Sequence, residues 1–166
     1  MNKAEKIIIV VAILLVIGLV AYFGFMKNAN KFQAYRTKAN TGSNISNVMI
    51  SDYKTLNKLV SDKSINTELT DLTTFKKSNI SEIFTEEYFE TNKVALLATY
   101  EDTSNTYYYS VDNVKYDKTK TIATIYYTDE KGEYVGTFKN SWNNIFLIEL
   151  PETVTEVNFI KSETKK

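Results

Sequence analysis

The chain has 166 residues, with 20 basic and 20 acidic side chains, and it contains neither histidine nor cysteine. The absence of both residues excludes disulfides, Ser-His-Asp and Cys-His catalytic machinery, and the usual zinc and copper sites. The zero net charge hides an asymmetry, because the part from Ala39 onward has 14 basic and 19 acidic residues, and such an acidic part argues against a nucleic-acid partner.

The segment Ile7–Phe25 is a run of 19 residues without a charged side chain. A helix of that length rises about 28 Å, close to the ~30 Å thickness of the bilayer hydrocarbon core. We therefore expect a short basic tail at residues 1–6 and then a single transmembrane helix that contacts the lipid bilayer. A cleaved signal peptide is the alternative, but its apolar core normally has only about 7–15 residues.

Basic residues flank the apolar segment on both sides. Two lysines precede it, and four basic residues follow it up to Lys38. A positive-inside count alone favours a cytoplasmic domain. An N-terminal signal-anchor, however, normally exports the chain that follows it. We expect a single-pass protein of the cell membrane with its soluble domain outside the cytoplasm, and a cytoplasmic domain remains the alternative.

The remainder of the chain divides by composition. Residues 26–44 show no strand pattern and are expected to form a basic juxtamembrane stalk. Residues 45–161 have the size of one domain, and residues 162–166 form a polar tail. A domain of that length buries about two-thirds of its unfolded surface, so it needs no disulfide to hold a core.

Two short helices are predicted in the first half of the domain. Asn47–Ile50 reads as a short strand, and Ser51 is placed to cap the helix that follows. The apolar residues of this helix lie along one face: Tyr53, Leu56, Leu59 and Val60. After a polar loop at Ser61–Thr70, the second helix falls within Ile80–Glu90, with Thr85 as its N-cap.

The second half of the domain has the sequence pattern of β-strands. Predicted strands cover residues 94–98, 106–111, 114–116, 122–127, 134–138, 145–150 and 157–160, with turns at 117–119 and 129–132. The short connections indicate a mainly antiparallel sheet. The fold class is therefore α+β, a transmembrane helix followed by one domain with such a sheet and two short helices.

Acidic residues offer one catalytic chemistry that needs neither histidine nor cysteine. Glycosidase-type hydrolysis needs two carboxylates about 5–10 Å apart. Two groups stand close in sequence: Glu86, Glu87 and Glu90, and Glu101 with Asp102. A solvated helix start and a polar loop explain them more economically. No calcium-loop pattern and no glycine-rich phosphate loop occurs, so we predict no catalytic residue, metal ligand or cofactor.

The chain is rich in aromatic residues, with twelve tyrosines and one tryptophan. Tyrosine and tryptophan are typical anchors at protein interfaces and also stack on sugar rings. The side chains best placed by the strand pattern for a binding surface are Trp142, Tyr108, Tyr126 and Tyr127. They would contact a protein or a cell-wall polymer. Ordinary packing of the sheet is the competing interpretation.

Hydrophobic spacing from Phe84 to Phe159 resembles that of small exported domains of low-GC Gram-positive bacteria. The spacing comprises Phe84-x4-Phe89-x2-Asn92, then Tyr109-x-Val111-x2-Val114, and finally Phe146–Pro151. The stretch is also similar to the C-terminal domain of PrcB-type protease-complex subunits, although Tyr107–Tyr109 stands where that domain has a Gly-Gly-Tyr-like segment. The resemblance implies that this part of the chain has a fold like that of these domains and a role in stabilising a partner protease.

The sequence thus predicts a membrane-anchored, extracytoplasmic binding or accessory module without catalytic machinery. A cell-envelope hydrolase that uses paired carboxylates and a scaffold at the cytoplasmic face are the two alternatives.

Overall fold

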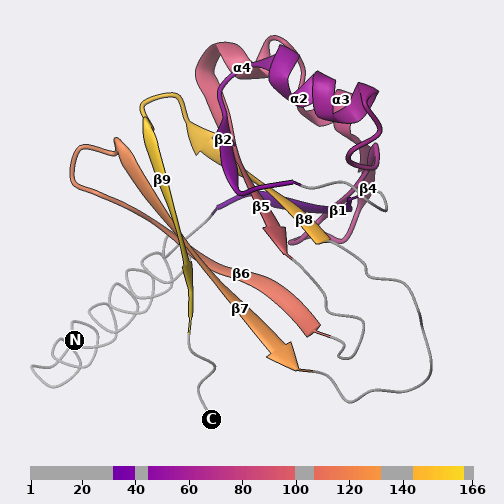
Figure 1. The fold of residues 1–166 in the computed structure, drawn as a ribbon. Coiled ribbons are helices and arrows are strands. Elements are labelled where there is room, and N and C mark those ends of the chain that lie inside the picture. Colours follow the sequence, from indigo (N-terminus) through magenta and orange to yellow (C-terminus); the bar gives the residue numbers. More distant parts are fainter. Residues whose placement is uncertain (1–31, 40–44, 100–106, 132–143, 163–166) are drawn as a thin grey trace, which may run out of the picture. The chain divides into compact units, whose positions relative to one another are not determined.

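A computed structural model describes residues 32–39, 45–99, 107–131 and 144–162, and at residues 107, 108 and 129–131 only the backbone. The chain divides into two compact units, Met1–Lys31 and Phe32–Lys166, and the described residues belong to the second. Its strands are β1 (Ala34–Lys38), β2 (Val48–Ile50), β3 (Glu68–Asp71), β4 (Lys77–Asn79), β5 (Asn92–Thr99), β6 (Tyr107–Tyr116), β7 (Ile122–Lys131), β8 (Asn144–Pro151) and β9 (Glu156–Lys161). Its described helices are α2 (Tyr53–Ser61), α3 (Ile80–Ile83) and α4 (Tyr88–Thr91) (Figure 1).

The larger sheet has six strands in the order β2-β5-β8-β1-β3-β4, and every neighbouring pair is antiparallel. Its longest pairing joins β5 to β8, from Asn92 opposite Pro151 to Thr99 opposite Asn144. Both strands are almost continuously apolar because both of their faces are buried.

The smaller sheet has the order β6-β7-β9. β6 and β7 form an antiparallel hairpin whose register shifts between Val111 and Asn113, and β9 runs parallel to β7. The hairpin turn is organised by Asp117, whose carboxylate accepts the backbone N–H groups of Thr121 and Ile122 at 2.7 and 2.9 Å. These bonds hold the pKa of Asp117 well below its usual range.

The core lies on both faces of the larger sheet. On one face, Leu56 of α2, Ile80 of α3 and the buried Phe84 pack against the strands. On the other face, Val114 and Ile125 of the smaller sheet pack against a second apolar cluster that includes Phe146. The described unit is therefore layered as helices, a six-stranded sheet and a three-stranded sheet (Figure 1).

The predicted α+β class and the mainly antiparallel sheet are confirmed. Residues 80–91 form two separate turns of helix rather than one, so the described residues contain three short helices where two were expected. The N-cap of α2 is Asp52, not Ser51, because the Asp52 carboxylate accepts the N–H of Thr55 at 2.8 Å. Asn79 caps α3 in a capping box with Glu82.

Three segments differ from the sequence prediction. The compact unit begins at Phe32, ahead of the expected boundary at residue 45, because β1 lies between β8 and β3. β3 occupies the end of the expected loop at residues 61–70, where Thr37 Oγ1 on β1 donates to the carbonyl of Asn66 at 3.0 Å. β7 continues through Lys131, so residues 129–131 are not the expected turn.

In the described part of the chain, no helix is long and apolar enough to cross a membrane. The expected transmembrane segment at residues 7–25, the stalk up to residue 31 and most of the polar tail lie outside the described residues.

Candidate functional site

One face of the larger sheet changes character between its centre and its edge. At β8, Phe146 is 1% exposed because the smaller sheet packs over it. Arg36 of β1 pairs directly with Phe146, Thr70 of β3 pairs with Arg36, and Lys77 of β4 pairs with Thr70. Residues paired across a sheet share a face, so an apolar side chain is followed by a polar row towards the edge.

This polar row lines a hollow of about 500 Å³, which we call the basic hollow. Its lining residues include Arg36, Lys38, Glu68, Thr70, Lys77 and Asn144. Three of these side chains are basic and one is acidic. Arg36, Lys38, Glu68 and Lys77 are all exposed to solvent. The hollow is therefore an accessible site with an excess of positive charge.

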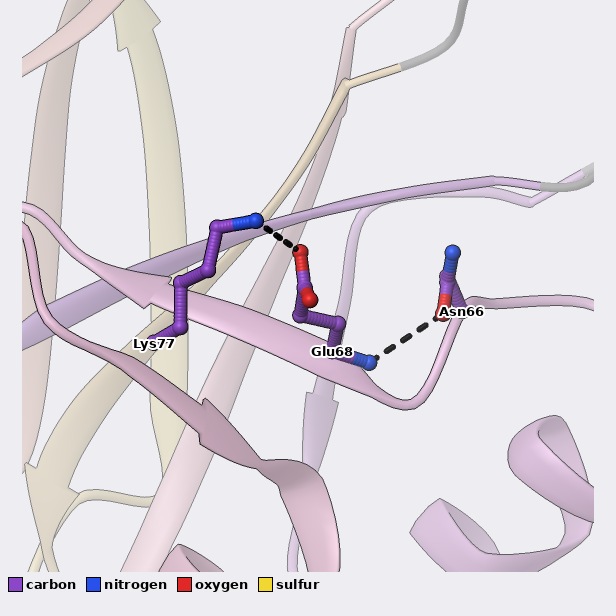
Figure 2. Close-up of polar contacts among 3 residues, drawn as sticks. All are labelled: Asn66, Glu68 and Lys77. Atoms are coloured by element: carbon purple, nitrogen blue, oxygen red, sulfur yellow. Dashed lines mark hydrogen bonds and ion pairs between the residues drawn. The ribbon is translucent and has the colours of Figure 1, made fainter.

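The acidic residue of the hollow already has a partner. Glu68 Oε1 lies 2.9 Å from Lys77 Nζ, and these side chains extend towards one another from adjacent strands (Figure 2). The N–H of Glu68 donates to Asn66 Oδ1 at 3.1 Å, which fixes the start of β3. Because both charged side chains are more than half exposed, the ion pair contributes only about 0–1 kcal/mol. A ligand that binds Lys77 in place of Glu68 therefore pays only a small free-energy cost for breaking the ion pair.

Arg36 supplies the charge that remains available. Among the described residues, no hydrogen bond or ion pair engages its guanidinium group. A guanidinium presents several N–H donors in a planar fork, which matches the oxygens of a carboxylate or a phosphate. The hollow can therefore bind an anionic group. Within the described ranges, no group of three or more acidic residues is arranged to hold a metal ion.

No family model, no curated protein and no solved structure matches this chain.

A second polar cluster lies on the opposite face of the larger sheet, beside the helices. The buried Tyr35 hydroxyl donates to Glu149 Oε1 at 3.0 Å, and the Tyr35 ring meets Phe84 edge-on at 5.4 Å. Burial and the nearby Glu149 carboxylate raise the pKa of Tyr35 to about 12. Burial also raises the pKa of Glu149, while the hydrogen bond from Tyr35 opposes that rise.

Asp71 is the second carboxylate of this cluster. It accepts the backbone N–H groups of Thr73 and Thr74 at 2.7 and 2.8 Å, and Gln33 Nε2 at 2.6 Å. These bonds lower the pKa of Asp71, led by the bond from Thr74. Its negative charge helps to raise the pKa of Glu149. Asp71, whose own pKa is lowered, thus contributes to the raised pKa of Glu149 at this end of the sheet.

The tyrosines proposed from sequence fall on both faces of the smaller sheet. Tyr127 is half-buried and packs against the core cluster beneath β7. Tyr126 points the other way, with Lys115 Nζ 5.1 Å from its ring centre and Ile160 beside it in register. The backbone of Tyr108 pairs with Glu130, and Trp142 lies outside the described residues.

The structure describes only one of the two acidic groups considered for catalysis. Glu86, Glu87 and Glu90 are all exposed around α4, and Glu101 with Asp102 lies outside the described residues. Sequence reasoning missed both Glu149 and the basic hollow. The single acidic residue inside the apolar run Ile145–Leu150 was the available signal for Glu149.

Proposed function

We propose that this chain is a binding or accessory module, anchored in the membrane by Ile7–Phe25, that holds a partner with its extracytoplasmic domain. The observation that carries the proposal is the basic hollow. It is an open sheet surface where Arg36 has no described partner and Lys77 has only an exposed ion pair. Neither the hollow nor the composition supplies a nucleophile with a histidine base, so binding is the chemistry that this surface supports.

Charge narrows the class of partner. The part of the chain from Ala39 onward has a net charge of −5, whereas the described lining of the hollow carries three basic residues and one acidic residue. A long polyanion would meet repulsion beyond the hollow, so a discrete carboxylate or phosphate is favoured. A protein side chain or a cell-wall polymer substituent provides such a group. A protein partner is also what the resemblance to PrcB-type domains implies.

The test compares two charge-matched variants of the full chain. Cells that produce tagged protein are treated with a crosslinker, and the partners recovered from their membranes are identified and quantified. In the first variant, Arg36→Gln is combined with Lys77→Gln, which leaves Glu68 unpaired in the hollow. In the control, Lys54→Gln is combined with Lys58→Gln on the exposed side of α2.

We expect the hollow variant to lose at least about tenfold of the wild-type partner yield, because each charge-assisted hydrogen bond contributes about 1.5–3 kcal/mol. The α2 control removes the same charge and should retain the partner. Equal recovery with both variants would remove the hollow from the binding surface.

The tyrosine surface is a separate proposal about the same module. Trp142→Ala or a Tyr108 substitution is expected to weaken partner capture without unfolding the domain. Tyr126 is the described candidate on the outer face of the smaller sheet, beside Ile160, which is 44% exposed. Retention of every partner by these variants would rule out this face.

One observation supports the hydrolase alternative. Glu149 has a raised pKa and Asp71 has a lowered pKa, as a general acid and an ionised partner require. In that reading Glu149→Gln abolishes breakdown of isolated cell-envelope polymer, and activity falls as the pH rises through the pKa of Glu149. No release of soluble fragments by the wild-type chain would remove the alternative. Scaffolding at the cytoplasmic face requires the opposite topology, which protease accessibility tests.

A further inference from the structure

Phe75 has the most exposed large apolar side chain in the described part of the domain. It is 76% exposed, whereas Val48, Tyr116 and Ile160 are only 37–44% exposed. It lies in the turn between β3 and β4 and contributes to neither apolar core cluster. Phe75 therefore adds nothing to the described core.

The backbone of Phe75 is also unfavourable for this residue type. Its φ angle is +57°, in the left-handed region where a side chain crowds the backbone and where glycine is preferred. Glycine at this position would relieve both the conformational cost and the exposure of the ring. A bulky residue that holds this backbone conformation outside both core clusters leads to the hypothesis of an external contact.

The turn holds Phe75 in a defined place. The N–H of Phe75 donates to the carbonyl of Asp71 at 2.9 Å, and the N–H of Asp71 donates to the carbonyl of Lys76 at 2.9 Å. The Asp71 carboxylate binds the N–H groups of Thr73 and Thr74. The ring is thus presented at the tip of a closed, hydrogen-bonded turn.

The same turn lies beside the point where the chain enters the domain. The N–H of Leu72 donates to the carbonyl of Ala34 at 3.0 Å, and Gln33 Nε2 donates to Asp71 Oδ2 at 2.6 Å. Only six residues separate Phe25 from Phe32, and even when fully extended the seven steps between them span about 25 Å. If Ile7–Phe25 spans the bilayer, the entry point of the domain lies within that distance of the lipid surface.

We propose that the β3–β4 turn is a second membrane contact, in which Phe75 inserts at the boundary between lipid headgroups and acyl chains. The exposed Lys76 follows it directly and can meet anionic headgroups. One ring and one lysine bind a membrane weakly by themselves. Tethering raises the effective concentration of the turn at the surface to the millimolar range, on the order needed for a weak contact. This proposal rests on the membrane anchor of the proposed function.

The absence of cysteine in the chain permits a site-specific test. The full-length Thr73→Cys variant, labelled with an environment-sensitive dye, is reconstituted into vesicles of phosphatidylcholine and phosphatidylglycerol that contain a shallow spin-labelled lipid. Thr73 is exposed and next to the tip, so the label reports on the turn while Phe75 is retained. The matched chain adds Phe75→Gly, which suits the left-handed backbone and should keep the fold. A dye on Lys58→Cys, on the exposed side of α2, gives the background.

We expect the dye at position 73 to be quenched at least about twofold more than the dye at position 58. Adding Phe75→Gly should return the quenching to that background. If the chain floats with the vesicles but the dye is quenched equally with and without Phe75, the ring does not insert into the membrane. That result would contradict the second membrane contact but not the membrane anchor. A chain that does not float with the vesicles would overturn both proposals.

Discussion

The hydroxyl of Tyr35 should stabilise the domain because it is the described donor to a half-buried carboxylate. Tyr35→Phe keeps the ring, and with it the edge-on contact with Phe84, but removes the 3.0 Å hydrogen bond to Glu149 Oε1. A hydrogen bond to a charged group contributes about 1.5–3 kcal/mol when buried. Because Glu149 is only partly buried, we expect a loss of about 1–2 kcal/mol in the free energy of unfolding at neutral pH.

The size of this loss should depend on pH. The folded-state pKa of Glu149 is raised by burial, so its ionised form lowers stability as the pH rises through that pKa. Tyr35→Phe removes the bond that opposes this rise. The free energy of unfolding of the variant should therefore be furthest below that of the wild type near pH 7. It should approach the wild type near pH 4, where a larger fraction of Glu149 is protonated.

Thermal unfolding of the full chain in detergent, followed by circular dichroism, measures the effect. For a domain of this size, 1 kcal/mol shifts the melting temperature by about 3–5 °C, so a decrease of roughly 3–10 °C is expected at pH 7. Tyr53→Phe is the matched control, because the half-buried Tyr53 hydroxyl has no partner among the described residues. Glu149→Gln in the Tyr35→Phe chain should reduce the loss. A loss that is absent, or identical at pH 4 and pH 7, would refute this reasoning.

Three further predictions concern local structure. Phe75→Gly should raise the stability of the domain by up to about 1 kcal/mol, because relief of the positive φ angle outweighs the greater entropy of glycine in the unfolded chain. A lower melting temperature would contradict this balance. Asp117→Ala should lower the melting temperature at pH 7, and the difference from the wild type should become progressively smaller as the pH falls from 4 towards 2. The depressed pKa of Asp117 means that its stabilisation is present above the unfolded-state pKa and disappears as the pH falls through the folded-state pKa. Phe146→Ala should cost about 3–5 kcal/mol in urea unfolding, and a cost below 1 kcal/mol would place Phe146 outside the core.

The elements that sequence predicts well are those whose character is local. β5 and β8 are continuous apolar runs buried on both faces, and α2 shows its apolar stripe directly in the sequence. β1 could not be predicted in the same way, because its strand depends on pairing with β8. Tyr35 pairs with Leu147, more than a hundred positions away. The polar residues Arg36 and Lys38 alternate along β1 with residues that are buried on its other face, so the sequence does not show that β1 is half-buried.

The basic hollow depends on register as well. Arg36, Thr70 and Lys77 come from three strands, and only the pairings of β1 with β3 and of β3 with β4 place them in one row. No spacing in the sequence encodes that row. The Glu149 cluster had a weak sequence signal, an acidic residue within an apolar strand, but its Tyr35 partner also required the fold.

Both proposals depend on the membrane anchor, and the proposed function also depends on its topology. Protease treatment of intact cells that carry a C-terminal epitope on the chain tests the topology directly, and a carbonate wash of membranes from untreated cells tests the anchor. We expect the epitope to remain with the membrane after the wash and to be lost when protease is added outside the cells. An epitope that is fully protected in intact cells and lost only after lysis would place the domain on the cytoplasmic side and contradict the proposed function.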